Sequence, residues 1–233
     1  MAPLVIAHRT CPRDAPENSL AGIAAAIASG ADVVEIDVRR SSDGQPMLLH
    51  DRWLWRTARR PVRLEWVTAH RARRMELRGG GTVPMLAEGL AALGPTMRAA
   101  IDVKDRGAAA AVLSEVRNQH LEGRVLFWSQ HEPAVRTAVA EAPELETSLL
   151  RDTDTPAELE RFLADAGRLG VGGISAHWSQ LGPELAQRCH DADLRLYAWC
   201  KTEAVEPEKL ALLDGLVTDW PATVRSQIGP SGA

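Results

Sequence analysis

The chain has 233 residues, of which 45% are hydrophobic and 25% charged, with a formal net charge of −4. This length suits one large domain rather than two, and the negative net charge argues against a general nucleic-acid binder. Three cysteines without a CxxC pair argue against a disulfide framework or a zinc site and favour a reducing compartment. Without a signal-peptide pattern or a run of about 18 apolar residues, we expect a cytoplasmic protein with no transmembrane segment.

Short apolar runs alternate with amphipathic helical patterns in the first half of the chain. Residues 4–8 predict a strand, and residues 18–29 predict a helix that Asn18 caps and Gly30 ends. A second strand is expected at 33–38, followed by a hairpin-like excursion through 42–44 to 47–50. A strand at 99–103 and a helix at 107–119 complete this half.

The second half repeats the alternation more regularly. Strands are predicted at 124–128, 145–150, 171–175, 194–198 and 215–218, with helices near 132–142, 156–168, 180–192, 203–212 and 221–227. Such alternation is typical of parallel strands joined by helical crossovers, and eight of them favour a single (β/α)8 TIM barrel. A doubly wound open sheet is the alternative. We expect one domain at 1–228 and a loose tail at 229–233.

Residues 52–78 interrupt this rhythm with a short insertion rich in arginine, including Arg52, Arg56, Arg59, Arg60 and Arg63. One interpretation is a solvated, irregular insertion without a specific role. The other is an arginine-rich rim near the active site that attracts anionic substrates or makes weak contact with an anionic lipid surface. The sequence leaves both interpretations open.

Two acidic residues, Glu35 and Asp37, lie within the second predicted strand. Because side chains alternate faces along a strand, both point the same way, about 6.6 Å apart along the backbone. The next parallel strand repeats the arrangement, with Asp102 and Lys104 on one face. Acidic side chains on the inner face of an apolar strand are unfavourable unless they are paired or bound to a cation.

Three carboxylates that converge from neighbouring strands form a hard-oxygen site, which suits Mg²⁺ or Ca²⁺ better than zinc. A phosphate held between such a cation and two basic groups would account for Arg9 and Lys104 beside the carboxylates. A purely structural network of buried ion pairs explains the same charges and is the alternative.

Two histidines, His8 and His50, favour the catalytic interpretation. Each is next to a charged residue, and together they bracket the acidic strand in the sequence. Phosphodiester cleavage requires one group that accepts a proton from the nucleophile and another that protonates the leaving alkoxide. Imidazole performs both tasks near neutral pH.

An ordered set of motifs runs through most of the chain. It comprises Ala7-His8-Arg9, Pro16-Glu17-Asn18-Ser19, Gly30-Ala31-Asp32-Val33-Val34-Glu35-Ile36-Asp37-Val38, Asp43-Gly44, Leu49-His50-Asp51, Val83-Pro84-Met85-Leu86-Ala87-Glu88, Ile101-Asp102-Val103-Lys104, Tyr197-Ala198-Trp199 and Val217-Thr218-Asp219-Trp220-Pro221. In order and spacing this set resembles the glycerophosphodiester phosphodiesterase family. The resemblance implies a TIM barrel of the glycerophosphodiesterase and phosphatidylinositol-phospholipase-C-like type.

The resemblance also implies an activity: hydrolysis of a small-molecule glycerophosphodiester to an alcohol and glycerol 3-phosphate with one divalent cation, Mg²⁺ or Ca²⁺. In the implied route, the glycerol 2-hydroxyl attacks phosphorus to form a cyclic phosphate, which water then opens. The implied roles are acid–base catalysis for His8 and His50, metal ligation for Glu35, Asp37 and Asp102, and phosphate binding for Arg9 and Lys104, with Glu17 close by. Trp199 either stacks on the glycerol or headgroup, or packs in the core.

Three features differ from the family pattern. Thr10 stands where a glycine usually follows His-Arg, and we expect it to narrow the approach to the phosphate. Asp102 replaces a glutamate and is one methylene shorter, so we expect a water between it and the ion. The stretch from His50 to Asp102 is short and rich in arginine, which leaves the alcohol group of the substrate open.

Several alternatives therefore stand beside the leading hypothesis. A phosphodiesterase of the same fold could act on a lysophospholipid or a specialised-metabolite phosphodiester. A barrel that binds phosphoesters without turning them over is the alternative from another class. We expect Asp219 to cap or hydrogen-bond at the barrel end rather than catalyse, and the oligomeric state is not predicted.

Overall fold

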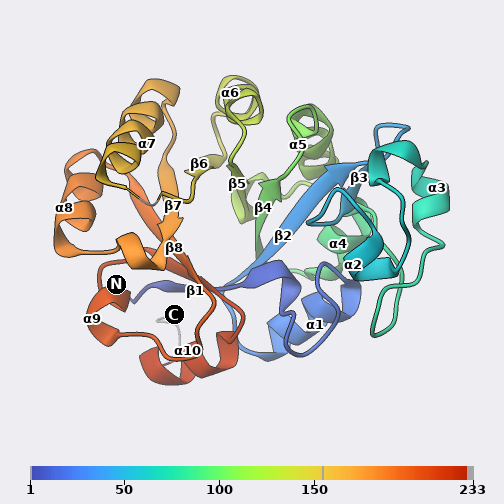
Figure 1. Ribbon diagram of the computed structural model, residues 1–233, viewed down its shortest axis with the longest axis horizontal. Helices are drawn as coiled ribbons and strands as arrows, with labels where there is room; N and C mark the ends of the chain where they lie inside the picture. The colour runs from blue at the N-terminus through green and yellow to red at the C-terminus, as the bar shows by residue number, and fades with distance from the viewer. Residues whose placement is uncertain (1, 154, 230–233) are drawn as a thin grey trace.

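The computed structural model describes residues 2–153 and 155–229. Within that part of the chain, eight parallel strands form a closed barrel surrounded by helices, which confirms the predicted TIM barrel (Figure 1). The barrel strands are β1 (Leu4–Ala7), β2 (Val33–Arg40), β4 (Arg98–Val103), β5 (Val125–Ser129), β6 (Glu146–Leu150), β7 (Gly173–His177), β8 (Arg195–Cys200) and β9 (Gly215–Thr218). Pairing of β1 with both β2 and β9 closes the ring. Of the expected tail, residues 230–233 lie outside the described residues.

The predicted hairpin excursion is also present, as β3 (Pro46–Leu48), which pairs antiparallel with β2 at the edge of the barrel. The longer helices are α1 (Leu20–Ala28), α4 (Leu86–Ala92), α5 (Ala109–Asn118), α6 (Glu132–Glu141), α7 (Pro156–Leu169), α8 (Pro183–Asp191) and α10 (Pro221–Ile228). No helix of the described residues is long and apolar enough to cross a membrane.

Two predicted helices begin later than expected because each has a proline at its start. The pattern at 180–192 predicted a helix, but α8 starts at Pro183. The pattern at 203–212 corresponds to a single turn, α9 (Pro207–Leu210). Proline has no N–H to donate within a helix, so it is tolerated in the first turn and not inside the helix.

The cap of α1 is also one residue later than predicted. Ser19 is the N-cap, and its hydroxyl accepts a hydrogen bond from the Gly22 N–H at 2.9 Å. Asn18, which we expected to cap the helix, lies in the left-handed region with φ of 51° and binds a strand residue instead. The assignment of the cap to Asn18 is therefore wrong.

The apolar side chains form two layers around the sheet. On β2, Val34, Ile36 and Val38 face outward into a large cluster with the first helices. A smaller cluster fills the barrel interior and includes Val33, Ala100, Leu126, Trp128 and Tyr197. Side chains alternate faces along a strand, so the inner-face positions after Val33 are Glu35 and Asp37, and the one after Ala100 is Asp102. These three side chains lie nearer the mouth of the barrel than the interior cluster.

The arginine-rich insertion is an ordered substructure. It contains α2 (Trp55–Ala58), the 3₁₀ turn η2 (Leu64–Trp66) and α3 (Ala69–Ala72), and it lies beside β3 on one side of the molecule (Figure 1). Its apolar residues, among them Leu54, Leu64 and Val67, pack into a hydrophobic cluster of their own. The stretch is therefore ordered around its own core, with single helical turns joined by irregular segments, and its role stays a prediction.

Candidate active site

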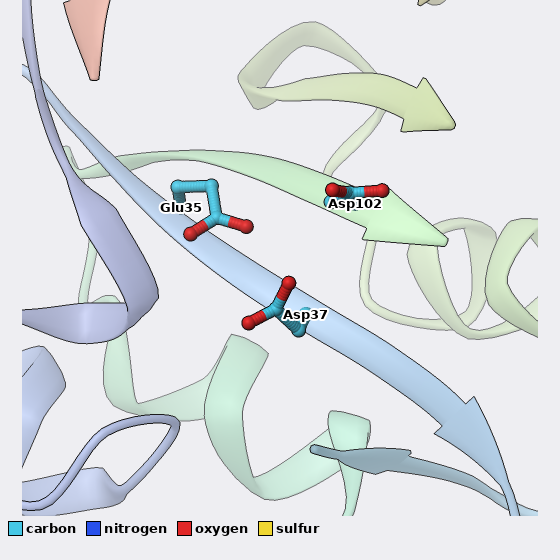
Figure 2. Close-up of side chains that lie close together, drawn as sticks. All are labelled: Glu35, Asp37 and Asp102. Atoms are coloured by element: carbon cyan, nitrogen blue, oxygen red, sulfur yellow. The ribbon is translucent and has the colours of Figure 1, made fainter. Parts of the chain in front are cut away.

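Three carboxylates meet on the inner face of the barrel (Figure 2). Glu35 and Asp37 come from β2, and Asp102 comes from the neighbouring strand β4, where it is the register partner of Asp37. One oxygen of each carboxylate lies within 4.8 Å of the other two, and all three side chains are buried. The predicted convergence of acidic side chains from neighbouring strands is present.

The loop after β1 supplies neutral partners for two of these carboxylates. The Arg9 backbone N–H donates to Glu35 Oε2 at 2.6 Å. The Asn18 side chain donates to Asp37 Oδ2 at 2.7 Å, and its Oδ1 accepts from the Asp37 N–H at 2.9 Å. Arg9 and Asn18 both have positive φ, so the loop is held in a strained conformation that aims them at the strand.

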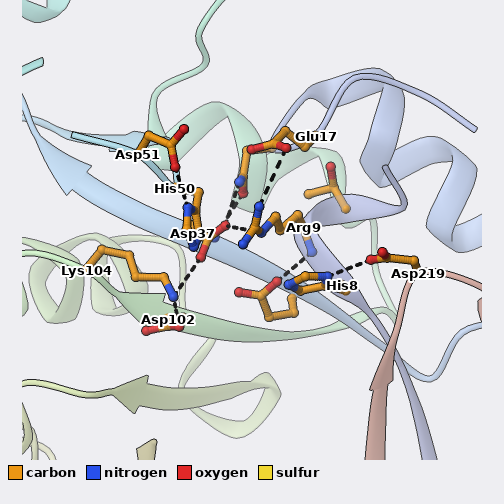
Figure 3. A network of polar contacts seen from close by, with 12 residues as sticks. His8, Arg9, Glu17, Asp37, His50, Asp51, Asp102, Lys104 and Asp219 are labelled. Carbon is orange, nitrogen blue, oxygen red and sulfur yellow. Dashed lines mark hydrogen bonds and ion pairs between the residues drawn. The ribbon is translucent and has the colours of Figure 1, made fainter. Parts of the chain in front are cut away.

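Two basic side chains lie against the carboxylates, as predicted from the sequence (Figure 3). Lys104 Nζ is 3.2 Å from Asp37 Oδ1 and forms a second ion pair with Asp102. Arg9 Nε lies 3.6 Å from Asp37 Oδ2. Burial lowers the pKa of Lys104, but the charges of Asp102, Asp37 and Glu35 outweigh burial and raise it above its usual value, so Lys104 stays charged.

The carboxylates do not share this positive charge equally. Burial raises the pKa of Glu35 well above its ordinary value, and the charges of Asp37 and Asp102 add to the rise. Burial also raises the pKa of Asp102, against the charge of Lys104. Burial acts in the same direction on Asp37, but Lys104, His50 and Arg9 together hold its pKa below the usual range. Two cations are thus too few for three buried carboxylates.

The site fits a bound divalent cation. Carboxylate oxygens are hard ligands of the kind that Mg²⁺ and Ca²⁺ prefer, and three of them converge here. Asp102 Oδ2 pairs with Lys104, but Asp102 Oδ1 is buried and accepts no hydrogen bond from the residues that the structure describes, which is unfavourable. A cation between Glu35, Asp37 and Asp102 would satisfy that oxygen and offset the excess negative charge.

Each of the two predicted catalytic histidines has a carboxylate partner at Nδ1 (Figure 3). His8 follows β1 directly, and its Nδ1 lies 2.6 Å from Asp219 Oδ1. His50 Nδ1 lies 2.7 Å from Asp51 Oδ1, and burial lowers the pKa of His50 although Asp37 opposes the change. We assign a proton to each Nδ1, which leaves Nε2 free to accept or donate a proton.

Asp219 was expected to hydrogen-bond at the barrel end, and its partner is a candidate catalytic side chain. Asp219 follows β9, which pairs with β1 in the closed barrel, and this pairing brings it to His8 across 211 positions of sequence. Two signals were present in the sequence: Asp219 directly follows a predicted barrel strand, and it belongs to the motif Val217-Thr218-Asp219-Trp220-Pro221. Neither signal names the partner.

Sequence reasoning missed Arg39, which connects two strand ends at the mouth. Its Nε donates to the His50 carbonyl at 2.6 Å, and its Nη1 donates to the Lys104 carbonyl at 2.9 Å. Burial lowers the pKa of Arg39, and the nearby charge of Arg52 adds to the effect. Arg39 therefore holds a candidate catalytic histidine and a candidate phosphate ligand at a set spacing.

Glu17 lies next to the site, as the family resemblance implied. It forms a two-pronged ion pair with Arg56 of α2, with an Nη2–Oε1 distance of 2.7 Å, and it lies 3.7 Å from Arg9. Arg56 also donates from Nε to Asp51 Oδ2 at 2.6 Å. The insertion is thus tied to the partners of both Arg9 and His50.

A cavity of about 370 Å³ collects most of the predicted site residues in its wall. From the early strands it is lined by His8, Arg9, Glu35, His50, Asp102 and Lys104, and from the late strands by Arg151, Asp152, Trp199 and Lys201. Asp37 and Glu17 do not line it but contact residues that do.

The late side of this cavity is built around Trp199. Its indole N–H donates to Asp152 Oδ1 at 3.1 Å, and its ring packs edge-on against His177 at 4.4 Å between centroids. Lys201 Nζ lies 5.0 Å from the same ring centroid. Trp199 therefore lines the cavity and also packs against the interior apolar cluster, so its contact with a substrate stays a prediction.

Thr10 does not narrow the cavity. Its side chain is fully buried, its hydroxyl accepts from the Ser19 N–H at 3.2 Å, and it points to α1 at Gly22. A Cβ on Gly22 would lie 2.2 Å from Thr10 Oγ1, so that glycine makes room for the threonine. Thr10, which replaces the usual glycine, is accommodated because its side chain packs against α1 and not into the cavity.

The fold and the site together define a class of protein. It is a parallel α/β barrel whose mouth combines a hard-oxygen cation site, two carboxylate-paired histidines and two basic groups, which suits phosphate esters. The chain belongs to the Glycerophosphoryl diester phosphodiesterase family, whose family model matches residues 8–223. This match confirms the predicted family.

Known proteins similar to this chain are named as phosphodiesterases. A glycerophosphodiester phosphodiesterase of Caldanaerobacter subterraneus subsp. tengcongensis is 25% identical over 247 residues, with both chains covered in full. A phosphodiesterase of Oleispira antarctica, solved with the product sn-glycerol-3-phosphate, is 26% identical with a TM-score of 0.81 and 97% of each chain covered.

A third relative shares the fold. A putative glycerophosphoryl diester phosphodiesterase of Silicibacter pomeroyi DSS-3 has a TM-score of 0.84 at 24% identity, covering 97% of this chain and 93% of its own. The relatives and structural neighbours are thus glycerophosphodiester phosphodiesterases, and the prediction of an enzyme of that class is confirmed.

Proposed function

We propose that this protein hydrolyses small glycerophosphodiesters to an alcohol and glycerol 3-phosphate, with His8 and His50 as the acid–base pair and one divalent cation, Mg²⁺ or Ca²⁺. The observation that carries the proposal is the pairing of each histidine Nδ1 with a carboxylate beside one cavity. That pairing orients both imidazoles and leaves their Nε2 atoms for proton transfer.

The binding roles follow from the charges around the cavity. Glu35, Asp37 and Asp102 would hold the cation, which when bound would neutralise charge that develops on the phosphoryl oxygens. Arg9 and Lys104, which adjoin the same carboxylates, would bind the phosphate from the protein side. Trp199 would contact the glycerol or the alcohol group from the late side of the cavity.

Proton transfers balance over two steps. In the first, one imidazole takes the proton of the glycerol 2-hydroxyl as its oxygen attacks phosphorus, and the other, protonated, gives a proton to the departing alcohol. In the second, the imidazole left neutral takes a proton from water, which opens the cyclic phosphate. The first imidazole then returns its proton to the 2-oxygen, so both histidines regain their starting states.

A product screen tests this proposal. Glycerophosphocholine, glycerophosphoethanolamine, glycerophosphoglycerol and a lysophospholipid are each incubated with the protein and Mg²⁺ or Ca²⁺, with excess EDTA as the control. We expect glycerol 3-phosphate and free alcohol from at least one glycerophosphodiester, and none in EDTA. Binding of all four without turnover would instead identify a non-catalytic phosphoester-binding barrel, and turnover of the lysophospholipid alone would identify the lipid alternative.

A further inference from the structure

Three tryptophans of the insertion face solvent. Trp53, Trp55 and Trp66 are 46%, 62% and 59% exposed. Among the described residues, the other large exposed apolar side chains are Leu20 at 43% and Ile27 at 41%, both on α1. Tryptophan is on average a largely buried residue, so three exposed ones within residues 53–66 are unusual for a surface without a partner.

These tryptophans are outside although the insertion has a core of its own. Leu54 lies between Trp53 and Trp55 and is fully buried, and Leu64 is buried two positions before Trp66. The Trp53 and Trp66 rings pack edge-on with centroids 5.4 Å apart. Buried leucines therefore alternate with exposed tryptophans along this stretch. The insertion has an apolar core without the tryptophans, so their exposure is not explained by a missing core.

The same stretch is strongly basic. From residue 51 to residue 66 it carries five arginines against two carboxylates, in a chain whose net charge is −4. Arg52, Arg59 and Arg60 are exposed, and their guanidinium groups make no hydrogen bond or ion pair with other described residues. Arg63 lies over the Trp66 ring at 5.3 Å and pairs with Glu65. Unpaired arginines beside exposed indoles complement a negatively charged, amphipathic surface.

This surface adjoins the mouth of the cavity. Arg56 of α2 contacts Glu17 and Asp51, which in turn hold Arg9 and His50. The charge of Arg52 also acts on Arg39 in the cavity wall. A ligand bound across α2 would therefore lie next to the entrance through which a phosphodiester reaches the site.

We propose that Trp53, Trp55 and Trp66, with Arg52, Arg59 and Arg60, form a docking surface for an anionic phospholipid bilayer. Indole rings favour the headgroup region, where their apolar body and N–H are both accommodated. Arginines next to them bind lipid phosphates and the negative surface potential. The bilayer is favoured over a protein partner because the free guanidinium groups match a dense array of phosphates.

Vesicle flotation of the full chain tests the apolar part of the surface. The protein is mixed with phosphatidylcholine vesicles that contain either no anionic lipid or about 30% phosphatidylglycerol. The second composition gives a negative surface potential of the kind that attracts basic segments. We expect binding to the anionic vesicles only, and a loss of about tenfold or more in the triple variant Trp53→Ser, Trp55→Ser, Trp66→Ser. The matched control is Leu20→Ser with Ile27→Ser, which removes similarly exposed apolar side chains elsewhere and should bind as the wild type.

A second pair of variants tests the charge. Arg52→Gln with Arg60→Gln should weaken binding by roughly fivefold per arginine, and the loss should shrink in high salt. Arg161→Gln on α7 is the matched control, because Arg161 is also exposed and makes no ion pair with other described residues. Thermal unfolding by circular dichroism checks that each variant folds. The single Trp55→Ser variant, which breaks no ring contact, replaces the triple variant if that one unfolds.

The outcomes are distinct. Equal binding of the triple variant and the wild type, or equal binding to neutral and anionic vesicles, overturns the proposal. A change in oligomeric state in the triple variant, measured by analytical ultracentrifugation without lipid, would assign the surface to a second copy of the chain instead. None of these measurements depends on turnover, so the docking surface and the proposed hydrolysis succeed or fail separately.

Discussion

The two sides of the barrel mouth differ in how tightly their polar groups are held. On the early side, Glu35, Asp37 and Asp102 are buried and joined to Lys104 and Arg9 by short contacts from several elements. On the late side, Trp199, Asp152 and Lys201 are half-buried or exposed, and Trp199 contacts one carboxylate and one imidazole. Reacting groups must be held at set distances, whereas a group that recognises a variable alcohol need not be. We therefore expect early-side variants to lower kcat and late-side variants to raise KM.

The largest effect is expected for the double variant Glu35→Gln with Asp37→Asn. It removes two of the three carboxylates that would hold the cation, and we expect loss of divalent-ion binding with a fall in turnover of about 10⁴-fold or more. Calorimetric titration with Mg²⁺ or Ca²⁺ measures the affinity. Glu146→Gln is the control, because Glu146 starts β6 and bonds Tyr197 away from the early-side carboxylates. Unchanged ion affinity in the double variant would move the cation site elsewhere.

The histidine variants come next. His8→Ala and His50→Ala should each slow the chemical step by about 10² to 10⁴-fold with the fold intact, the usual value of positioned proton transfer. The two effects should not add in the double variant, because both groups act on one transition state. Single-turnover kinetics measure the step, with the exposed His190→Ala as the control. A single variant with a near wild-type rate would exclude that histidine from the pair.

Asp102 tests how the third carboxylate acts. It is paired with Lys104 and also has an oxygen without a hydrogen-bond partner in the described residues. Asp102→Asn should weaken cation affinity by about 10- to 100-fold because it removes one charge. If a water lies between Asp102 and the ion, Asp102→Glu should bind as tightly as the wild type or more tightly. A glutamate variant much weaker than the asparagine variant would show that Asp102 is a direct ligand in a filled site.

Asp219 is a positioning residue for His8 on the early side. Asp219→Asn keeps the size but removes the charge that holds the Nδ1 proton, so we expect kcat to fall by about 10- to 100-fold with little change in KM. Asp219→Glu should restore part of the rate, because it keeps a carboxylate. Equal losses in both variants, or a change in KM alone, would mean that the bond between Asp219 and His8 only stabilises the barrel end.

The smallest effect is expected on the late side. Trp199→Ala removes the aromatic wall of the cavity, and we expect KM to rise by roughly threefold to tenfold while kcat stays close to wild type. The rise should differ between substrates with different alcohol groups. Leu20→Ala, an exposed apolar side chain of α1 outside the cavity, is the control. A fall in kcat as large as that of the early-side variants would erase the distinction between the two sides.

Much of the early side could be predicted from the sequence because the relevant contacts are set locally. Strand alternation places Glu35 and Asp37 on one face, and Asp102 and Lys104 on the next, wherever the strands lie. The strand–helix alternation predicts a barrel, and the carboxyl ends of its strands meet at one mouth. His8 and Arg9 follow from their position at the end of β1.

Contacts made through barrel closure could not be predicted from the sequence. Asp219 reaches His8 only because β9 pairs with β1. The convergence of Asp37 and Asp102 was predicted, but their pairing is set by the register of β2 and β4. Asn18 looked like a helix cap, yet it binds Asp37 because Ser19 takes the cap and the loop turns back to the strand. The outward position of Trp53 and Trp66 likewise depends on how the insertion packs its own core. Local pattern sets which face a side chain occupies, whereas strand register and loop packing set its neighbours.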